Sequence, residues 1–308
     1  MASSRQLKTK LQAVGNIKQM TRAMELVAAT KMRKSQEVAF RARPYAKKAL
    51  SLLRNLLISS GEENLVGLSH FFKRTGIKKK CLVVVTSDRG LCGAYNSQVL
   101  RAAWRFSQEH GNSDIVAVGR KANDFFMRRG KTLANSFAHF SDITTLADVE
   151  PLANWLLVSY KTHAYDEIVF CSTVFISALQ QRVEAQEILP LDIEALEKII
   201  KRIVPKTGRY SEYSNGNTDK PIPYIFEPSG ALVFEKLAEE LVRVEILHLI
   251  FESNASEHSS RMIAMKNATE NANRLGEELT LALNKARQAA VTQELTEIST
   301  AKEALTSE

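Results

Sequence analysis

One turn in the sequence combines residue types that could bind a phosphate group. The segment TSDRGLCGAYN, Thr86 to Asn96, follows a short apolar run and precedes a stretch with helical spacing. Open α/β folds bind ligands at such junctions, where glycines let backbone amides approach a phosphate at the start of a helix. Gly90 and Gly93 could serve in this way. A nucleotide-binding enzyme that uses Ser87 to Gly93 is therefore one hypothesis for the function.

The same turn lacks the spacing of the common phosphate-binding loops. It matches neither GxGxxG nor GxxxxGK[ST], and it has no third glycine for close helix packing. A strand-to-helix turn that needs glycine torsions, with Asn96 or Ser97 as the helix cap, is the favoured interpretation. We then expect Asp88 and Arg89 to form a local ion pair rather than to act as catalysts.

The cysteines and histidines show no recognisable reactive or metal-binding pattern. Cys92 lies near a predicted helix N-terminus, but no histidine is close in sequence to act as its base. Cys81, Cys92 and Cys171 lack metal-ligand spacing, so we interpret them as reduced and mostly buried. The six histidines contain no HExxH motif, and His258 is expected to pack in a helical seam. The sequence thus predicts no catalytic residue, no cofactor and no metal.

Charge is distributed unevenly along the 308 residues. Residues 1 to 80 carry 18 Lys and Arg against 4 Glu, whereas residues 81 to 308 carry 24 Lys and Arg against 30 Asp and Glu, for a net charge of +8. The basic segment is either a solvated helix face or a contact surface for an acidic partner. Salt-sensitive nucleic-acid binding is another hypothesis, although no aromatic residue precedes Phe40 in this segment.

No part of the sequence predicts insertion into a membrane. No apolar run approaches the roughly 18 residues of a membrane span, and the polar start MASSRQLKTK has no signal-peptide core. We therefore expect the chain to stay in the compartment where it is made.

Two long helical segments flank the residues considered so far. The first runs from Ser3 to about Ile58, and Pro44 should bend or interrupt it. Its apolar stripe consists of Leu7, Leu11, Val14, Ile17, Met20, Met24 and Val27. The second runs from Ala231 to the end, with Gly276 as its one further interior glycine. Its stripe recurs every 3.5 residues or so, as in a coiled coil, at Leu241, Val244, Leu247, Phe251, Ala255, His258, Met262, Met265, Ala268, Ala272, Leu275, Leu279 and Leu283.

The second helix would be about 115 Å long at 1.5 Å per residue, so it needs a partner helix or an enclosing protein. The first helix is the economical partner, in an antiparallel pair. Beyond Ala286 the apolar residues are mostly small. This end of the helix either frays or fits a narrow sleeve without locking into it.

The middle of the chain has the pattern of an open α/β sheet. Continuous apolar runs predict buried strands at 81–86, 115–118 and 167–172, and an alternating run predicts an edge strand at 181–189. Helices are expected at 97–110, 121–129, 151–163 and 192–204. Strands that alternate with helices imply parallel crossovers.

The predicted fold class is α/β plus a long coiled coil, in which the terminal helices form an antiparallel coiled coil and the centre is an open, Rossmann-like α/β domain. The expected divisions are an N-terminal coiled-coil helix (1–60), a polar linker (61–80), the α/β domain (81–204), an irregular loop (205–230) and a C-terminal coiled-coil helix (231–308).

Four stretches, in order along the chain, resemble the gamma subunits of F-type ATP synthases. The most specific is ASEHSSRMIAMKNATENANRLGEELTLALNKARQAAVTQELTEI, Ala255 to Ile298. The run IKQMTRAMELVAATKMRKSQ, Ile17 to Gln36, resembles the first helix of that family. The turn TSDRGLCGAYN and the segment YIFEP, Tyr224 to Pro228, are similar to two further family segments.

The resemblance implies a rotor shaft of a bacterial-type, proton-translocating ATP synthase. Its partners would be the alpha and beta subunits of the hexamer, the epsilon subunit and the c-subunit ring, with no nucleic acid. Proton flow would turn the ring, and the shaft would drive ATP synthesis on the beta subunits without itself catalysing a reaction. The complex would hold the chain as a peripheral protein at the cytoplasmic face of the bacterial inner (plasma) membrane.

The resemblance also assigns roles to individual positions. Residues similar to those that contact the hexamer are Lys18, Arg22, Met24, Arg287, Gln288 and Thr292. Tyr224 and Glu227 fall where the family meets the c ring, although Phe226 replaces a residue that is often tyrosine. The cysteine pair of the chloroplast redox switch has no counterpart, so thiol regulation is not expected.

Overall fold

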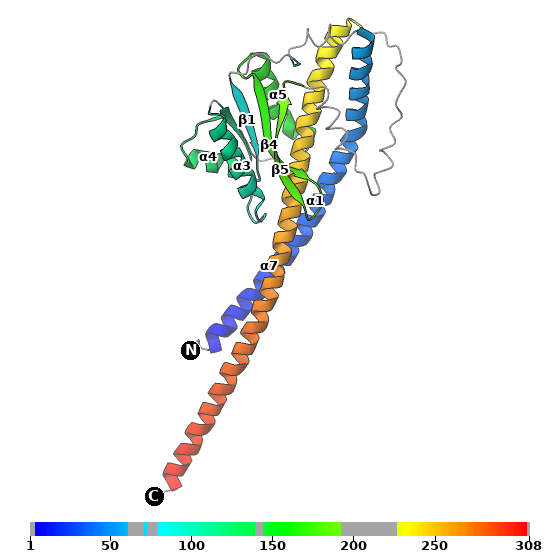
Figure 1. Ribbon diagram of the computed structural model, residues 1–308. Coiled ribbons are helices and arrows are strands. Elements are labelled where there is room, and N and C mark those ends of the chain that lie inside the picture. Colours follow the sequence, from blue (N-terminus) through cyan, green and yellow to red (C-terminus); the bar gives the residue numbers. More distant parts are fainter. Residues whose placement is uncertain are drawn as a thin grey trace. The chain divides into compact units, whose positions relative to one another are not determined.

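The structure, a computed structural model, describes residues 4–60, 71–72, 79–111, 113–138, 144–191 and 227–306 (Figure 1). It divides into two compact units. One unit holds the described residues up to Ala28 together with those from Arg261 onward, and the other spans Ala29–Ser260. These divisions cut both long helices, so they differ from the domain boundaries expected from the sequence.

The larger unit is built on a five-stranded sheet in the order β3-β2-β1-β4-β5. The strands are β1 (Lys80–Val85), β2 (Ser113–Val118), β3 (Leu133–Phe137), β4 (Glu167–Phe175) and β5 (Gln181–Leu189). β1 pairs in parallel with β2 and β4, β2 pairs in parallel with β3, and β5 is antiparallel to β4. The open α/β sheet and the edge strand at 181–189 are therefore confirmed. β3, at the opposite edge, was not predicted.

Helices cover both faces of this sheet (Figure 1). One face packs against α3 (Tyr95–Glu109) and α4 (Arg120–Arg128) through residues such as Leu82 and Val84. The other face packs against α5 (Leu146–Lys161) and the first part of α7 (Gly230–Thr306) through Val83 and Val85. Alternate residues of β1 thus enter two separate cores, because successive side chains of a strand point to opposite faces.

The larger core includes two residues that the sequence analysis placed in a polar linker. Phe71 and Phe72 are both buried, and the backbone N–H of Leu191 donates to the Phe71 carbonyl at 2.6 Å. Phe72 stacks on Phe234 of α7, with ring centroids 5.2 Å apart. Two aromatic side chains within a polar stretch are enough to anchor this point of the chain in the core. The rest of the predicted linker, up to residue 78, lies outside the described residues.

The smaller unit pairs the beginning of α1 (Ser4–Ser60) with the C-terminal part of α7. The two helices run in opposite directions, which confirms the predicted antiparallel pair (Figure 1). Residues 18–25 of α1 face 266–273 of α7, whereas residues 11–18 face 272–281. α1 is helical through Pro44, so the expected interruption is absent.

The seam of this helix pair differs from the predicted stripe by one residue over part of its length. On α1 the seam continues from Leu7 to Thr21 and Ala28, all buried, whereas Ile17, Met20, Met24 and Val27 are exposed. On α7 the seam contains Met265, Thr269 and Ala272, and Leu275 is exposed. The hydroxyls of Thr21 and Thr269 form a hydrogen bond of 2.8 Å across it. Apart from Leu7 and Met265, the helices bury small and polar residues in the seam, and ten large apolar side chains are left exposed.

Candidate functional site

The turn that suggested phosphate binding is held together by its own hydrogen bonds. The backbone N–H of Ser87 donates to Asn96 Oδ1 at 3.0 Å, and Asn96 Nδ2 donates to Ser87 Oγ at 2.7 Å and lies 3.1 Å from the Cys92 sulfur. Gly93 has a φ of +57°, as expected for a turn glycine. The predicted cap is wrong, since Ala94 is the N-cap of α3 and Asn96 binds back to the turn.

The amides at the start of α4 are also occupied. Asp88 Oδ1 accepts the N–H of Arg120 at 2.9 Å, the Ser87 carbonyl accepts that of Lys121 at 3.2 Å, and Thr86 Oγ1 accepts that of Ala122 at 2.9 Å. These are the donors that a phosphate at this helix N-terminus would need. The loop from β1 therefore caps α4 in the place where a phosphate would bind.

The crevice at the carboxyl ends of β1 and β4 is the place where an open α/β sheet binds ligands, because the strand order reverses there. α7 contacts the loops at this end of the sheet. Tyr95 Oη and Ser253 Oγ are 2.6 Å apart, Asn254 Nδ2 donates to Thr144 Oγ1 at 2.6 Å, and Ser259 Oγ donates to the Ala178 carbonyl at 2.5 Å. A helix of the chain itself thus occupies the surroundings of the nucleotide site that the alternative hypothesis requires.

The thiols of the sheet are unsuited to nucleophilic chemistry. Burial, reinforced by Asp114, raises the pKa of Cys81 to about 12, and burial raises the pKa of Cys171 to about 12. All three cysteines are free and buried, as predicted. Within the described ranges, no group of three His, Cys, Asp or Glu side chains could hold a metal ion.

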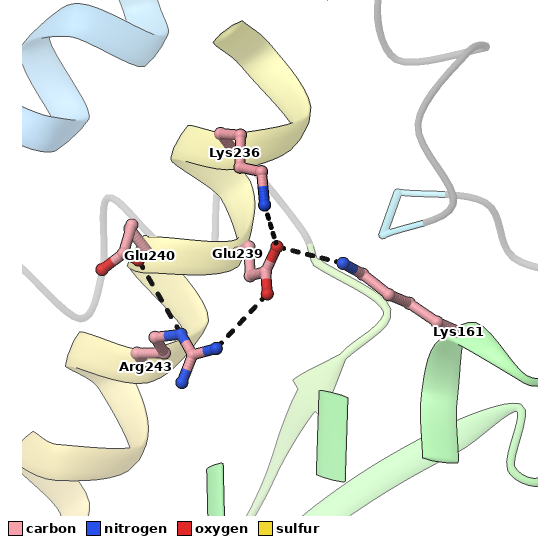
Figure 2. Close-up of polar contacts among 5 residues, drawn as sticks. All are labelled: Lys161, Lys236, Glu239, Glu240 and Arg243. Carbon is pink, nitrogen blue, oxygen red and sulfur yellow. Dashed lines mark hydrogen bonds and ion pairs between the residues drawn. The ribbon is translucent and has the colours of Figure 1, made fainter. Parts of the chain in front are cut away.

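A charged cluster joins α5 to α7 (Figure 2). Glu239 of α7 is 3.0 Å from Lys161 Nζ, 3.3 Å from Arg243 Nη2 and 3.5 Å from Lys236 Nζ. Partial burial opposes ionisation of Glu239, but the hydrogen bond and charge of Lys161, with those of its neighbours, keep its pKa below the usual value. Arg243 also contacts Glu240 at 3.8 Å. The cluster fixes the beginning of the long helix to the α/β unit.

The buried face of α7 also carries a carboxyl group, Glu245, that forms no ion pair in the part of the chain that the structure describes. Glu245 is buried and accepts a hydrogen bond of 3.1 Å from Gln186 Nε2 of β5. Burial raises the pKa of Glu245 to about 8, and the bond from Gln186 only partly offsets this effect. Glu245 is therefore protonated, and neutral, in the folded protein at neutral pH.

The helix pair exposes large apolar side chains that do not contribute to the core of the folded chain. Ten large apolar side chains are exposed on its two helices: Ile17, Met20, Met24, Leu26 and Val27 on α1, and Leu275, Leu281, Val291, Leu295 and Ile298 on α7. Such a set, repeated along both helices, is typical of a surface that another protein covers. The candidate functional site is this surface of the helix pair, and it has the chemistry of an interface.

The structure places most of the predicted contact residues on exposed positions of this pair. Lys18 and Arg22 line a groove between the helices, and Arg22 forms an ion pair of 2.9 Å with Glu25. Met24 lies on the exposed apolar side. These residues and the α7 group around Arg287 are not brought together, since Arg287 lies 14 residues, about 21 Å along the helix, beyond the last α7 residue of that groove.

The α7 group occupies a single stretch of exposed helix. Arg287, Gln288 and Thr292 are exposed, and Thr292 Oγ1 donates to the Gln288 carbonyl at 2.9 Å. Glu227, just before α7, is exposed as well. Tyr224, together with the predicted helix at 192–204 and most of the loop at 205–230, lies outside the described residues.

Sequence reasoning missed two features of this surface. Ile17 and Met20 were assigned to the seam, although their offset from Thr21 and Ala28 places them outside. Gly15 and Gly276 were not recognised as the walls of a groove. A seam assigned to the small residues, instead of the large apolar ones, would have predicted both the exposed apolar side chains and the groove.

Comparisons with known proteins agree with this description. A family model described as ATP synthase matches residues 3–305. The ATP synthase gamma chain of Chloroflexus aurantiacus is 36% identical over 315 residues, covering 100% of both chains, and that of Legionella pneumophila is 34% identical over 302 residues, covering 97% of this chain and 98% of the other.

Solved structures show the same fold. The central stalk of the Tetrahymena thermophila mitochondrial ATP synthase aligns with a TM-score of 0.57 and 25% identity, over 81% of this chain and 99% of the other. A chain of the Euglena gracilis mitochondrial ATP synthase aligns with a TM-score of 0.65 and 19% identity, over 98% and 94%. Given the full-length matches in sequence, this chain belongs to the ATP synthase gamma chain family.

Proposed function

We propose that the chain is the central rotor shaft of an ATP synthase, and that it transmits torque without catalysing a reaction. Proton flow through the c ring turns the shaft, and the shaft drives the beta subunits through the conformations in which they make ATP. Family membership supports this role, as does a site composed of exposed helix surface rather than reactive groups. The nucleotide-binding alternative is not favoured, because the relatives that match over the full length are ATP synthase gamma chains.

One observation carries the proposal. The terminal helix pair buries mostly small and polar residues in its seam, apart from Leu7 and Met265, and exposes ten large apolar residues. A helix pair without a partner would bury its large apolar residues in the seam, since each buried leucine or methionine contributes about 1.5–3 kcal/mol to the free energy of unfolding. Their outward position indicates a sleeve of other subunits around the pair, which we identify as the alpha and beta subunits of the hexamer.

The individual contacts are proposed from the family resemblance, and the exposed positions of these residues support them. Arg287, Gln288 and Thr292 present charge and hydrogen-bonding groups on one stretch of α7 and are proposed to contact an acidic loop of the beta subunit. On α1, Lys18, Arg22 and Met24 are proposed to face the hexamer. Arg22 is paired with Glu25, whereas Lys18 and Arg287 form no ion pair in the part of the chain that the structure describes.

Tyr224 and Glu227, which precede α7 in the sequence, are proposed to contact the c ring, with the epsilon subunit beside it. No described helix is both long enough and apolar enough to cross a membrane. We propose that the chain is held at the cytoplasmic face of the bacterial plasma membrane through these partners, as a peripheral subunit.

Single-molecule rotation tests the proposal. Gln108 on α3 is exposed and the three native cysteines are buried, so Gln108→Cys provides one reactive thiol for a visible probe. In a complex reconstituted with alpha and beta subunits, ATP hydrolysis should turn the probe in one direction. If the hexamer hydrolysed ATP in its normal rotary cycle without this chain, or with the probe stationary, the proposed function would be wrong.

A further inference from the structure

A groove crosses the helix pair at a point where each helix has a glycine. It has a volume of about 580 Å³, and its walls include Gly15 of α1 and Gly276 of α7. A Cβ atom on Gly15 would meet no atom within 4 Å, and one on Gly276 would lie 3.9 Å from Val14 Cγ1. Neither glycine is required by a positive φ or by close packing. Their effect is to leave the groove open.

The walls of the groove are apolar and its edges are charged. Leu11, Val14 and Leu281 contribute apolar surface. Lys18 lies at one edge and Glu277 at the other, and in the part of the chain that the structure describes neither forms an ion pair. A glycine within a helix lowers stability by about as much as a small cavity does. Two glycines that face one groove therefore imply that the open groove serves to bind a partner.

We propose that this groove receives an apolar side chain from a loop of the alpha/beta hexamer. The inference rests on the proposed function and adds a defined contact to it. At about 580 Å³ the groove has room for a leucine, methionine or aromatic side chain together with part of the loop that carries it. The free charges favour a loop that carries an acidic group near Lys18 and a basic or donor group near Glu277.

The groove continues into the exposed apolar surface of the pair. Leu281, one of its walls, is 64% exposed, and Ile17 and Leu275 are exposed close by along the two helices. A partner that covers this surface must pass over the groove. An apolar side chain inserted there would fix the angular position of the shaft in the sleeve more sharply than contacts on a smooth helix surface.

Substitution of the two glycines tests the contact without weakening the fold. Gly15→Leu and Gly276→Leu each place a bulky side chain in the groove, whereas Gly15→Ala and Gly276→Ala are matched controls that add only a methyl group. All four changes raise helix propensity. The thermal midpoint of the isolated chain should therefore rise or stay the same, which shows that any loss of binding does not come from unfolding.

The measurement is the affinity of the labelled chain for the reconstituted alpha/beta hexamer. The Ala variants should bind like the wild type, and the Leu variants should bind about tenfold more weakly or worse, because a displaced apolar side chain loses its buried surface. Equal affinities of the Leu and Ala variants would overturn the inference. Light scattering gives a second check. If the wild type formed dimers and the Leu variants did not, the inference would also be overturned, because a second copy of the chain would then occupy the groove. Failure of the wild type to bind the hexamer would instead refute the proposed function.

Discussion

The two units of the molecule use the same long helices in opposite ways. Between Leu241 and Ser259, α7 is buried on nearly all sides against the sheet, α5 and their loops. From Arg261 onward the same helix buries only Met265, Thr269 and Ala272 among its described residues, and after Ala286 every described side chain is exposed. One stretch is thus a core helix of a stable α/β unit, and the other is a surface for a partner.

The contrast extends to the kind of contact. The α/β unit holds α7 with ion pairs at Glu239, hydrogen bonds from Ser253 and Ser259, and a large aromatic core. The helix pair is joined by the Thr21–Thr269 hydrogen bond and small side chains. A shaft needs a rigid attachment at one end and a slender, weakly adhesive surface at the other, and this distribution of contacts satisfies both requirements.

The largest effect on stability is expected in the core of the α/β unit. Phe170 of β4 is fully buried, whereas Leu295 of α7 is 62% exposed. Phe170→Ala should lower the free energy of unfolding by about 3–5 kcal/mol through the cavity it leaves, and Leu295→Ala should change it by less than about 0.5 kcal/mol. Urea denaturation of the isolated chain measures both. Equal losses would remove the distinction between the units.

A comparable effect is a pH dependence that originates at Glu245. Its pKa is about 8 in the folded chain against an ordinary value of 4.5, so folding favours the protonated form. The stability that this group contributes is complete below about pH 4.5, falls as the pH rises and is lost once the pH passes about 8. The full change is about 5 kcal/mol, because the pKa moves by about 3.5 units at about 1.4 kcal/mol for each unit.

Glu245→Gln tests this assignment, because the amide keeps the shape of the side chain and cannot ionise. Unfolding free energies measured between pH 5 and pH 9 should fall for the wild type and change much less for the variant. Glu252→Gln is the matched control, since Glu252 pairs with His248 at 3.3 Å on the same helix. If wild type and Glu245→Gln showed the same pH slope, another group would be responsible.

A smaller loss is expected from the cluster in Figure 2. Glu239→Gln removes the charge that Lys161 and Arg243 share and should cost about 1 kcal/mol of unfolding free energy, a typical value for a partly buried charged hydrogen bond. Glu240→Gln, at a more exposed carboxylate, should cost less than half as much. Thermal unfolding of the two variants measures both losses of stability. A larger loss for Glu240→Gln than for Glu239→Gln would argue against Glu239 as the attachment point.

The smallest effect on folding is expected at the far end of α7, where the functional effect should be clear. Arg287→Ala combined with Gln288→Ala should leave the unfolding free energy within about 0.5 kcal/mol of the wild type. In the reconstituted complex the same change should weaken the contact with the hexamer about tenfold, as expected for an arginine that carries much of an interface. A parallel loss of soluble, folded protein would indicate a structural role instead.

The sequence was sufficient for the elements whose patterns are strong. The alternation from Gln181 to Leu189 predicted β5 with its observed bounds, and the apolar run at Cys81 predicted β1 to within one residue. β3 was missed because LANSF has a mixed composition and lies at the edge of the sheet, where partial burial does not require an apolar run. The start of α5 was placed five residues late, at Pro151, because its N-terminal cap is a hydrogen bond from Thr145 N–H to Asp148 rather than a hydrophobic signal.

The register of the helix pair could not be predicted for a physical reason. Sequence patterns assume that large apolar residues are buried within the chain. Here Met20 and Met24 are kept for a partner, and Thr21 and Ala28 form the seam. The same assumption hid the groove at Gly15 and Gly276. Positions that contradict the usual pattern are therefore the ones that identify the functional surface.

Methionine oxidation tests the central claim most directly, because the chain contains internal standards. Met20 is 55% exposed and Met24 is 37% exposed, Met127 on α4 is 63% exposed, and Met265 is buried in the seam. In the free chain, peroxide should oxidise Met20, Met24 and Met127 quickly and Met265 slowly. In the complex with the alpha/beta hexamer, Met20 and Met24 should be oxidised about as slowly as Met265. Met127 should still be oxidised quickly, which shows that the peroxide is active. Unchanged oxidation of Met20 and Met24 in the assembled complex would contradict the central claim.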